Sequence, residues 1–407
     1  MALSDRIATL ESLDVASRRV FVRVDFDVPL EKGAVGDDTR IREALPTLRY
    51  LINAGARVVV ATHLGAAASE GRKAMSLEPI ALRLAELLGQ DVVLTDEPSG
   101  DGARKVVHDL RDGRIAVLEN LRADPGEELN DDVFARSLAR LADAYVNESF
   151  TLAHKSTASL DALARLVPVR AAGLQFRKEL DALGPITTSP QRPFFVVLGG
   201  TKLSEKRAAI EALIGRVDGI FLGGALTHTM LAAKGRTMGM SLLEEDKLPM
   251  ARDVLARAHA AKTALFLPSD LRVRRTSAKT ARGTKTDKEP DVTEVVSVDR
   301  VPSDAAGRDI GPATVEQYRH KLLGAGTILW LGPMGVGDKG EPAEGSIAMA
   351  HAIAEAAAHS IAVGKESCAA VRAAGVSARF KHSTASTAPV MALLEGRTLT
   401  AVEVLRT

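Results

Sequence analysis

The chain has 407 residues, more than one hydrophobic core usually organises, so two domains are expected. Its formal net charge is +1 and its sole cysteine is Cys368, which disfavours a polyanionic partner and excludes an internal disulfide. We find no apolar stretch long enough to span a bilayer, and the charged N-terminal segment lacks a signal core. These features predict a cytoplasmic protein that binds neither nucleic acid nor membrane.

Short apolar runs alternate with longer helical segments along the chain. The runs lie at 20–24, 58–61, 115–118 and 144–146 in the first half, and at 194–198, 219–222, 264–267, 327–331 and 360–363 in the second. The segments between them, such as 77–89 and 346–358, repeat apolar residues at helical spacing. This alternation predicts an α/β fold with parallel sheets and helices on both faces.

Ligands bind beyond the carboxyl ends of the strands in such sheets, so the residues that follow each run are informative. The first-half runs are followed by polar side chains that suit a small ionic substrate: Asp25, Asp27, His63, Arg122 and Asn147. The second-half runs are followed by glycines, where backbone can approach the phosphates of a nucleotide: Gly199, Gly200, Gly223, Gly224, Gly332 and Gly364. Two ligands on two domains indicate a phosphotransferase that closes over its substrates.

Two further segments bear on the domain organisation. A helix is predicted over 175–183, and a linker rich in proline, serine and threonine follows it. The basic segment over 275–292 contains no aromatic residue, so we interpret it as a surface loop and not as a nucleic-acid-binding arm.

Several motifs occur in the order and spacing found in phosphoglycerate kinases, and the chain resembles that family from about Val20 to Gly396. The motifs are VRVDFDVPL, DDTRIREALPTLRYL, THLG, LENLRADPGEELND, LGGTKLSEK, LPSD, DIGPAT, LGPMGV and LLEG. The resemblance implies two Rossmann-like domains joined by an interdomain helix. An N-terminal domain over 1–172, with the C-terminal tail over 389–407, binds the acid. A helix and linker over 173–188 precede a nucleotide-binding domain over 189–388.

The resemblance also implies the reaction and its catalytic residues. The reaction is reversible phosphoryl transfer between MgATP and the carboxylate of 3-phosphoglycerate, carried out by a monomer with ATP or ADP as co-substrate and Mg²⁺ as cofactor. Arg40 matches the family arginine that stabilises the transferring group and the acceptor carboxylate. Lys202 and Lys206 match lysines that reach the nucleotide phosphates, and their spacing places them on one helix face. Positive charge on the moving phosphoryl oxygens is what such a reaction needs.

The binding residues follow from the same resemblance. For the acid, we expect contacts from Asp25, Asp27, Arg40, His63, Arg122 and Lys155. For the nucleotide, we expect contacts from Gly199, Gly200, Lys202, Lys206, Gly223, Gly224, Leu331, Gly332, Pro333, Asp338, Gly364, Glu366 and Ser367. Glu366 is expected to hold Mg²⁺.

Several positions depart from the family pattern. The family has asparagine at Asp27, arginine at Ala66 and Lys155, glutamate at Asp338 and aspartate at Glu366. Two family glycine triplets read Val363-Gly364-Lys365 and Ser386-Thr387-Ala388, and we expect Ser386 or Thr387 to cap a helix that begins at Pro389.

The lost arginine contacts bear on the choice of acid. A missing charge-assisted contact lowers the affinity for a phosphate roughly tenfold. Two alternatives to phosphoglycerate kinase activity therefore stay open. One is a paralogue that phosphorylates a different carboxylic acid to an acyl phosphate. The other is a catalytically weakened nucleotide-binding protein.

Overall fold

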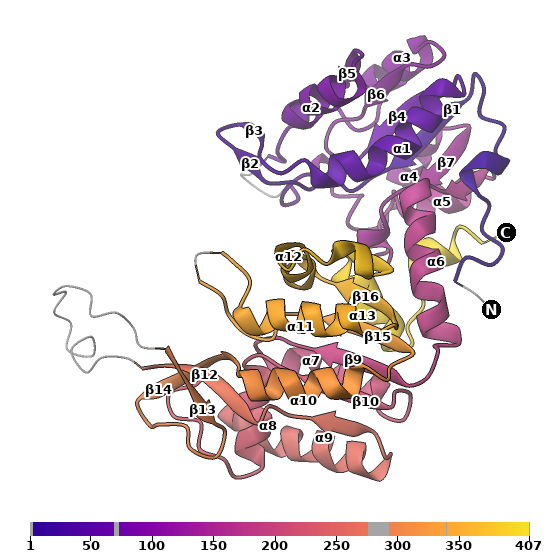
Figure 1. The fold of residues 1–407 in the computed structure, drawn as a ribbon. Coiled ribbons are helices and arrows are strands. Elements are labelled where there is room, and N and C mark those ends of the chain that lie inside the picture. The colour runs from indigo at the N-terminus through magenta and orange to yellow at the C-terminus, as the bar shows by residue number, and fades with distance from the viewer. Residues whose placement is uncertain (1–2, 69–72, 276–292, 339, 407) are drawn as a thin grey trace. The chain divides into compact units, whose positions relative to one another are not determined.

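The computed structural model describes residues 3–68, 73–275, 293–338 and 340–406 (Figure 1). The chain divides into two compact units: unit 1 comprises Met1–Gly184 and Arg397–Thr407, and unit 2 comprises Pro185–Gly396. Residues 389–396, which the sequence analysis assigns to the tail, thus lie in unit 2. The predicted basic surface loop falls outside the described residues except for Arg275, which ends a strand. Within the described ranges, no helix has both the length and the apolar character that crossing a membrane requires.

Unit 1 is built on a six-stranded parallel sheet with the strand order β5-β6-β4-β1-β7-β8. The strands are β1 (Arg19–Arg23), β4 (Arg57–Ala61), β5 (Val92–Leu94), β6 (Ile115–Val117), β7 (Ala144–Asn147) and β8 (Arg170–Ala172). The helices are α1 (Thr39–Asn53), α2 (Glu78–Leu88), α3 (Asp101–Asp109), α4 (Asp132–Ala139), α5 (Ala162–Leu166) and α14 (Thr400–Glu403). A short hairpin, β2 (Leu30–Glu31) and β3 (Ala34–Val35), follows β1.

Unit 2 contains a second six-stranded parallel sheet with the order β11-β10-β9-β15-β16-β17. Its strands are β9 (Phe194–Leu198), β10 (Gly219–Leu222), β11 (Ala264–Phe266), β15 (Thr327–Leu331), β16 (His359–Val363) and β17 (His382–Thr384). Its helices are α7 (Leu203–Leu213), α8 (Leu226–Ala233), α9 (Leu248–Ala260), α10 (Pro312–Leu322), α11 (Glu344–Glu355), α12 (Lys365–Ala373) and α13 (Thr387–Leu394). A small antiparallel sheet contains β12 (Asp270–Arg275), β13 (Thr293–Ser297) and β14 (Ala305–Ile310).

The cores explain why the strands read as continuous apolar runs. In unit 1, Val20 and Val22 of β1 pack with residues of α1 and α2 in one cluster. Phe21, between them, is also fully buried and stacks on Tyr145 of β7. Both faces of the strand are therefore covered, and every position favours an apolar side chain.

Each parallel sheet reverses its strand order beside its first strand. In unit 1, β1 lies between β4 and β7, and in unit 2, β9 lies between β10 and β15. Crevices form at the carboxyl ends of the strands at such switch points. The residues that follow these six strands are consequently the places where each unit can bind a ligand.

Every apolar run predicted to be a strand forms one, and the bounds of β9, β10 and β15 are as predicted. The edge strands β5, β8 and β17 were missed, and of these β8 (RAA) and β17 (HST) are not apolar, β-branched runs. Helix α6 (Leu174–Thr188) runs beyond its predicted end at Leu183 and includes Pro185. Proline removes one donor from a helix, but Pro185 O still accepts from Ser189 N–H at 3.0 Å, so the helical turn continues.

Glu148, just after β7, holds the N-terminus of α6. It is buried and accepts hydrogen bonds from the N–H groups of Gln175 and Phe176, each at 3.1 Å, and from the Thr47 hydroxyl. The first N–H groups of a helix have no partner inside it, so the carboxylate satisfies two of them. Gly173 leaves room for Glu148, because a Cβ there would clash with its carboxyl group. Burial is the largest effect on this group and raises the pKa of Glu148 to about 7.

Replacement of Glu148 by glutamine is expected to remove part of the pH dependence of unit 1 stability. Because its pKa is raised on folding, folded Glu148 binds its proton more tightly than the unfolded chain does. The wild type should therefore lose stability as pH rises from about 4.5 to about 7, by on the order of 3 kcal/mol. The measurement is urea unfolding of both proteins between pH 4.5 and 7.5, followed by circular dichroism. Glu11→Gln, at an exposed position of unit 1, is the control. If the stability difference between the wild type and Glu148→Gln stayed constant with pH, the raised pKa assigned to Glu148 would be wrong.

Candidate functional site

The switch point of unit 1 brings Arg40 against Asp25. Arg40, in the first turn of α1, donates from Nη1 to Asp25 Oδ2 at 2.9 Å and to the Asp27 carbonyl oxygen at 3.0 Å. Thr151 also donates to Asp25 Oδ2 from the short helix η3 (Phe150–Leu152). Asp25 is buried, whereas the Arg40 side chain is 27% exposed, so an anionic ligand can reach the guanidinium.

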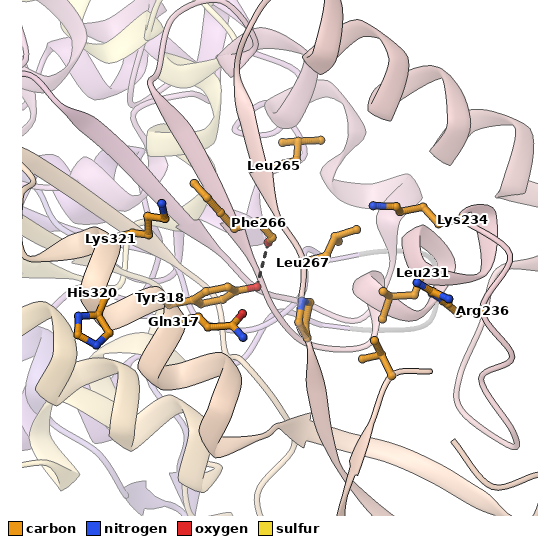
Figure 2. Close-up of a pocket in the computed structure, with 12 residues that line it drawn as sticks. Leu231, Lys234, Arg236, Leu265, Phe266, Leu267, Gln317, Tyr318, His320 and Lys321 are labelled. Carbon is orange, nitrogen blue, oxygen red and sulfur yellow. Dashed lines mark hydrogen bonds between the residues drawn. The ribbon is translucent and has the colours of Figure 1, made fainter. Parts of the chain in front are cut away.

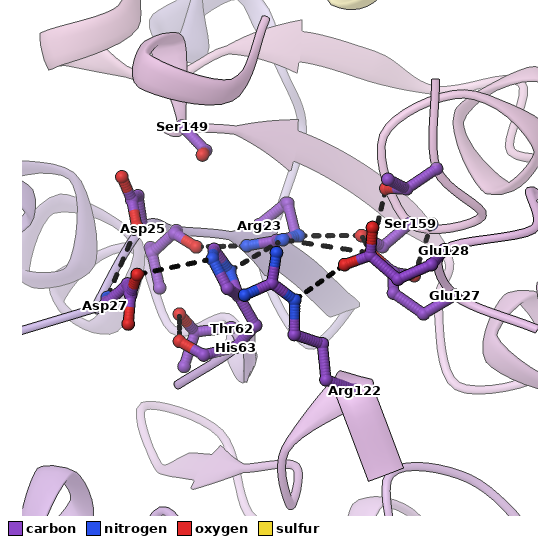
Figure 3. Close-up of polar contacts among 12 residues, drawn as sticks. Arg23, Asp25, Asp27, Thr62, His63, Arg122, Glu127, Glu128, Ser149 and Ser159 are labelled. Carbon is purple, nitrogen blue, oxygen red and sulfur yellow. Dashed lines mark hydrogen bonds and ion pairs between the residues drawn. The ribbon is translucent and has the colours of Figure 1, made fainter. Parts of the chain in front are cut away.

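A buried arginine that the sequence analysis missed lies beside His63 (Figure 3). Arg23, the last residue of β1, is 2% exposed and donates from Nε to Ser159 Oγ at 2.7 Å. Its Nη2 lies 3.8 Å from Glu127 Oε1, and Glu127 accepts from the Thr157 hydroxyl at 2.8 Å. Ser159 donates to the same carboxylate from its N–H at 3.0 Å and its hydroxyl at 2.6 Å. The arginine and its counterion are therefore buried together, and the Ser159 hydroxyl links them by hydrogen bonds.

His63 lies among the predicted cations and is neutral. It is 4% exposed, and its Nδ1 is 3.3 Å from Arg23 Nη2. Burial lowers its pKa most, and the nearby positive charges of Arg23, Arg122, Lys155 and Arg40 lower it further, to about 2. His63 already has internal partners, and its contact with the acid stays a prediction.

Asp27 and Arg122 both bind the turn at Gly65. The Gly65 N–H donates to Asp27 Oδ1 at 2.9 Å, and Arg122 Nη1 donates to the Gly65 carbonyl. Arg122 also donates from Nε to Glu128 Oε1 at 2.6 Å. The Asp27 side chain is 41% exposed and adds negative charge beside Ala66, which supplies no side-chain donor. Charged groups therefore hold this turn in place, but neither Asp27 nor Ala66 provides a side-chain donor for a phosphate.

Glu127→Ala is expected to destabilise unit 1 by about 3–5 kcal/mol, because it leaves the buried Arg23 without its counterion. Glu128→Ala is the matched control. The Glu128 side chain is 38% exposed, so its ion pair with Arg122 contributes about 1 kcal/mol or less to stability. Urea unfolding separates the units, because the sole tryptophan, Trp330, reports on unit 2 by fluorescence while circular dichroism reports on both. Equal losses in the two variants would show that the buried pair has no special role.

The switch point of unit 2 is made of glycines packed against one another. A Cβ on Gly199 would clash with the Pro333 carbonyl. Gly224 and Gly332 have φ values of +71° and +83°, and a Cβ on either would lie within 2.6 Å of the carbonyl oxygen of Gly200 or Gly199. Only glycine fits such contacts. The loops after β9, β10 and β15 thus present backbone without side chains, which suits the close approach of phosphates.

Two lysines stand beside this glycine cluster on α7. Lys202 is the N-cap residue, and its Nζ lies 3.5 Å from Glu205 Oε1 with 56% of the side chain exposed. Lys206 is half-buried, and its aliphatic chain runs past Gly200, where a Cβ would lie 3.3 Å from Lys206 Cε. The N-terminus of α7 adds partial positive charge. Unit 2 therefore gathers two ammonium groups and a helix end around its bare backbone.

The start of α12 carries the predicted magnesium ligand. Ser367 is buried and accepts from the Gly332 N–H at 2.8 Å, so it joins α12 to the loop after β15. Glu366 is exposed in the first turn of α12. Within the described part of the chain, no group of three or more histidine, cysteine, aspartate or glutamate side chains could hold a metal alone. Mg²⁺ commonly takes one or two carboxylates and completes its shell with water and phosphate oxygens, so Glu366 fits such a site.

The Asp338 side chain lies near two arginines of the small sheet. Asp338 is 78% exposed, and its Oδ1 lies 3.8 Å from Arg274 Nη1 and 3.6 Å from Arg308 Nη2, in the small sheet. These contacts direct it toward β12 and β14, and its predicted contact with the nucleotide stays untested.

The predicted helix cap is confirmed in position only. Helix α13 begins at Thr387 instead of Pro389 and has Ser386 at its N-cap position, but the Ser386 side chain makes no capping hydrogen bond. Ser386 is instead fixed through its N–H, which donates to Thr384 Oγ1 at 3.0 Å. The predicted triplet still lies near the other altered glycine loop, since a Cβ on Gly364 would be 3.1 Å from Thr387 Oγ1.

The arrangement is that of a two-unit parallel α/β protein with charged side chains at one switch point and glycines with lysines at the other. The family model for phosphoglycerate kinase matches residues 10–397, and the chain belongs to this family. It is 44% identical over 401 residues to the phosphoglycerate kinase of Anaeromyxobacter dehalogenans, with 98% of both chains covered. It is 40% identical over 397 residues to that of Pelotomaculum thermopropionicum, with the same coverage.

A solved structure agrees with the family assignment. The phosphoglycerate kinase from Coxiella burnetii matches with a TM-score of 0.85 at 30% identity, over 98% of each chain. The family and the α/β fold class predicted from the sequence are thereby confirmed. Membership of this family indicates a kinase, that is, a phosphotransferase.

Proposed function

We propose that this protein transfers a phosphoryl group reversibly between MgATP, bound by unit 2, and the carboxylate of 3-phosphoglycerate, bound by unit 1. The observation that supports this most is the Arg40 guanidinium, which lies beside the buried Asp25 and is 27% exposed, so that an anionic acid can reach it. The names of relatives at 40–44% identity over nearly the whole chain support the same activity.

The acid is activated by position and not by a base. A carboxylate is already ionised near neutral pH, so its oxygen can attack the γ-phosphorus directly while ADP leaves. Asp25 orients Arg40 through the hydrogen bond at 2.9 Å, and Arg40 in turn steers the attacking carboxylate. Because the acid is already ionised, no base has to remove a proton from it, and the neutral His63 is not needed as a base.

The nucleotide is held by backbone and ammonium groups. The bare loops at Gly199, Gly224 and Gly332 accept the phosphates, and Lys202 and Lys206 neutralise the charge that moves with the transferred group. Mg²⁺, when bound, would supply further charge neutralisation at the phosphate oxygens, and Glu366 would hold it.

The test is a coupled assay of the full chain with 3-phosphoglycerate and MgATP. We expect substantial turnover that depends on both substrates. Turnover no higher than that of the Lys206→Ala variant would reject the proposal. Calorimetry with ATP then distinguishes a protein that has lost catalysis but still binds nucleotide from one that does neither.

A second candidate acid is favoured by one observation, the exposed carboxylate of Asp27 beside Ala66. Negative charge at this turn repels a phosphate dianion, whereas an acid without a phosphate carries less negative charge and is repelled less. This alternative is tested by incubating the protein with ATP, hydroxylamine and each of a series of small hydroxy acids. An acyl phosphate formed from an acid without a phosphate group would be trapped as its hydroxamate. Asp27→Asn should then improve the use of 3-phosphoglycerate, and no improvement would count against the alternative.

A further inference from the structure

A cavity in unit 2, of about 620 Å³, lies along the outer strand β11 (Figure 2). It is bounded by β11 and the residues that follow it, by the end of α8, by α10 and by the segment after β13. Its lining includes none of the residues predicted to bind the nucleotide. Its volume falls within the range of about 300–1,000 Å³ that is usual for small-molecule sites.

The floor of this cavity is apolar. Leu231, Leu267 and Val298 line it together with the Phe266 ring. Tyr318 is 2% exposed and closes the inner end, because its hydroxyl donates to the carbonyl oxygens of Leu222 at 2.8 Å and Phe266 at 2.9 Å. The phenol is therefore satisfied internally, and its ring adds to the apolar surface, as Figure 2 shows. This floor suits a flat apolar body.

The open edge of β11 supplies hydrogen-bonding groups to the cavity. β11 is the outermost strand of its sheet, and the Ala264 N–H donates to Asp218 O toward β10. Backbone groups of successive residues in a strand point to opposite sides, so the N–H and C=O of Leu265 point away from β10. Leu265 also lines the cavity.

The rim of the cavity carries positive charge that carboxylates only partly offset. Lys234, Arg236, His320 and Lys321 line it, and no aspartate or glutamate is among its described lining residues. Arg236 pairs with Asp299 at 2.8 Å and His320 with Glu316 at 3.0 Å. In the part of the chain that the structure describes, Lys234 and Lys321 form no ion pair; we call these two residues the lysine rim. Lys321 Nζ lies 6.0 Å from the centre of the Phe266 ring, which places it at the apolar floor.

A cavity of similar size in unit 1 does not share this excess of positive charge. That cavity, of about 550 Å³, lies beside β5 and has three basic lining residues, but Asp91 and Asp109 also line it. Its charges therefore largely cancel. The cavity along β11 has similar apolar character but keeps its positive charge, and this combination selects for negatively charged ligands with an apolar body.

We propose that the cavity along β11 is a second ligand site, and that it binds a small amphipathic anion. The apolar body of the ligand packs on Phe266, Leu267 and Val298, and its acidic group lies at the lysine rim. This site does not depend on the proposed catalytic function.

The experiment uses 1-anilinonaphthalene-8-sulfonate as the probe, with the full chain, in a fluorescence titration. The probe should bind saturably, and affinity should fall as salt is added. Lys234→Glu combined with Lys321→Glu should weaken binding roughly tenfold or more, because two attractive charges become repulsive. Both lysines are exposed, so the folded structure should survive the change.

The matched control is Lys105→Glu combined with Arg111→Glu, which changes the charge of the unit 1 cavity by the same amount. It should leave probe binding within about twofold of the wild type. The uncharged N-phenyl-1-naphthylamine should bind the wild type and both double variants alike. Equal losses in the two double variants, or no loss at the lysine rim, would overturn the proposal. Competitive displacement of the probe by ATP would also overturn it, because the cavity would then belong to the nucleotide site.

Discussion

Lys206→Ala is expected to lower kcat for 3-phosphoglycerate and MgATP by at least about 100-fold. The half-buried Lys206 runs past Gly200 beside the bare loops of unit 2, where the nucleotide phosphates are proposed to lie. An ammonium group at this place acts mainly on the charge that develops during transfer. The KM for ATP should therefore change much less than kcat.

Arg207→Ala is the control for this variant. Arg207 is the next residue of α7, and it pairs with Glu211 at 2.7 Å on the exposed side of the helix. Its removal takes away the same charge from the same helix and should leave kcat within about twofold. If Lys206→Ala kept more than about a tenth of the wild-type kcat, the role assigned to this lysine would be wrong.

Arg40→Ala is expected to lower kcat/KM for the acid by about 100-fold to 1,000-fold. Two effects act together. The variant loses the guanidinium that steers the acceptor carboxylate, and it exposes Asp25, which then repels that carboxylate. Arg40→Lys should recover only part of the loss, because lysine keeps the charge but not the planar pair of donors.

The control for Arg40 lies two residues further along α1. Arg42 pairs with Asp38 at 2.8 Å and is 55% exposed, so Arg42→Ala should leave kcat/KM nearly unchanged. Parallel loss in Arg40→Ala and Arg42→Ala would point to damage to α1 instead of a role at the acid. Initial rates at several acid concentrations separate the effects on kcat and KM.

Much of the fold could be predicted because its strands are covered on both faces. Runs such as 194–198 are apolar at every position, and continuous runs of this kind are easily recognised. The end of α6 could not be predicted by the same means, since Gly184 and Pro185 normally end a helix. In this structure the helix continues through both residues. The hydrogen bond from the Gln175 N–H at the start of α6 to Glu148 joins residues far apart in the sequence, and the sequence alone cannot predict such a contact.

The candidate site was predictable where a polar side chain lies in the loop after a strand. Asp25, His63 and Arg122 lie in the loops after β1, β4 and β6, and the structure brings them together (Figure 3). Arg23 was missed because it lies inside an apolar run, although a charged residue in a doubly covered strand is itself a signal of a buried partner. That partner, Glu127, is far along the chain, and only the folded structure joins the two.

The central claim is that one charged group from each unit acts on a single transfer step. The most direct test follows the ³²P label from γ-labelled ATP to 3-phosphoglycerate in single turnovers of the wild type, Arg40→Ala, Lys206→Ala and the double variant. The account predicts fast transfer by the wild type, slow transfer by each single variant, and little further loss in the double variant, because both groups serve one transition state. Absence of labelled acyl phosphate with the wild type, or rapid transfer by the double variant, would contradict it.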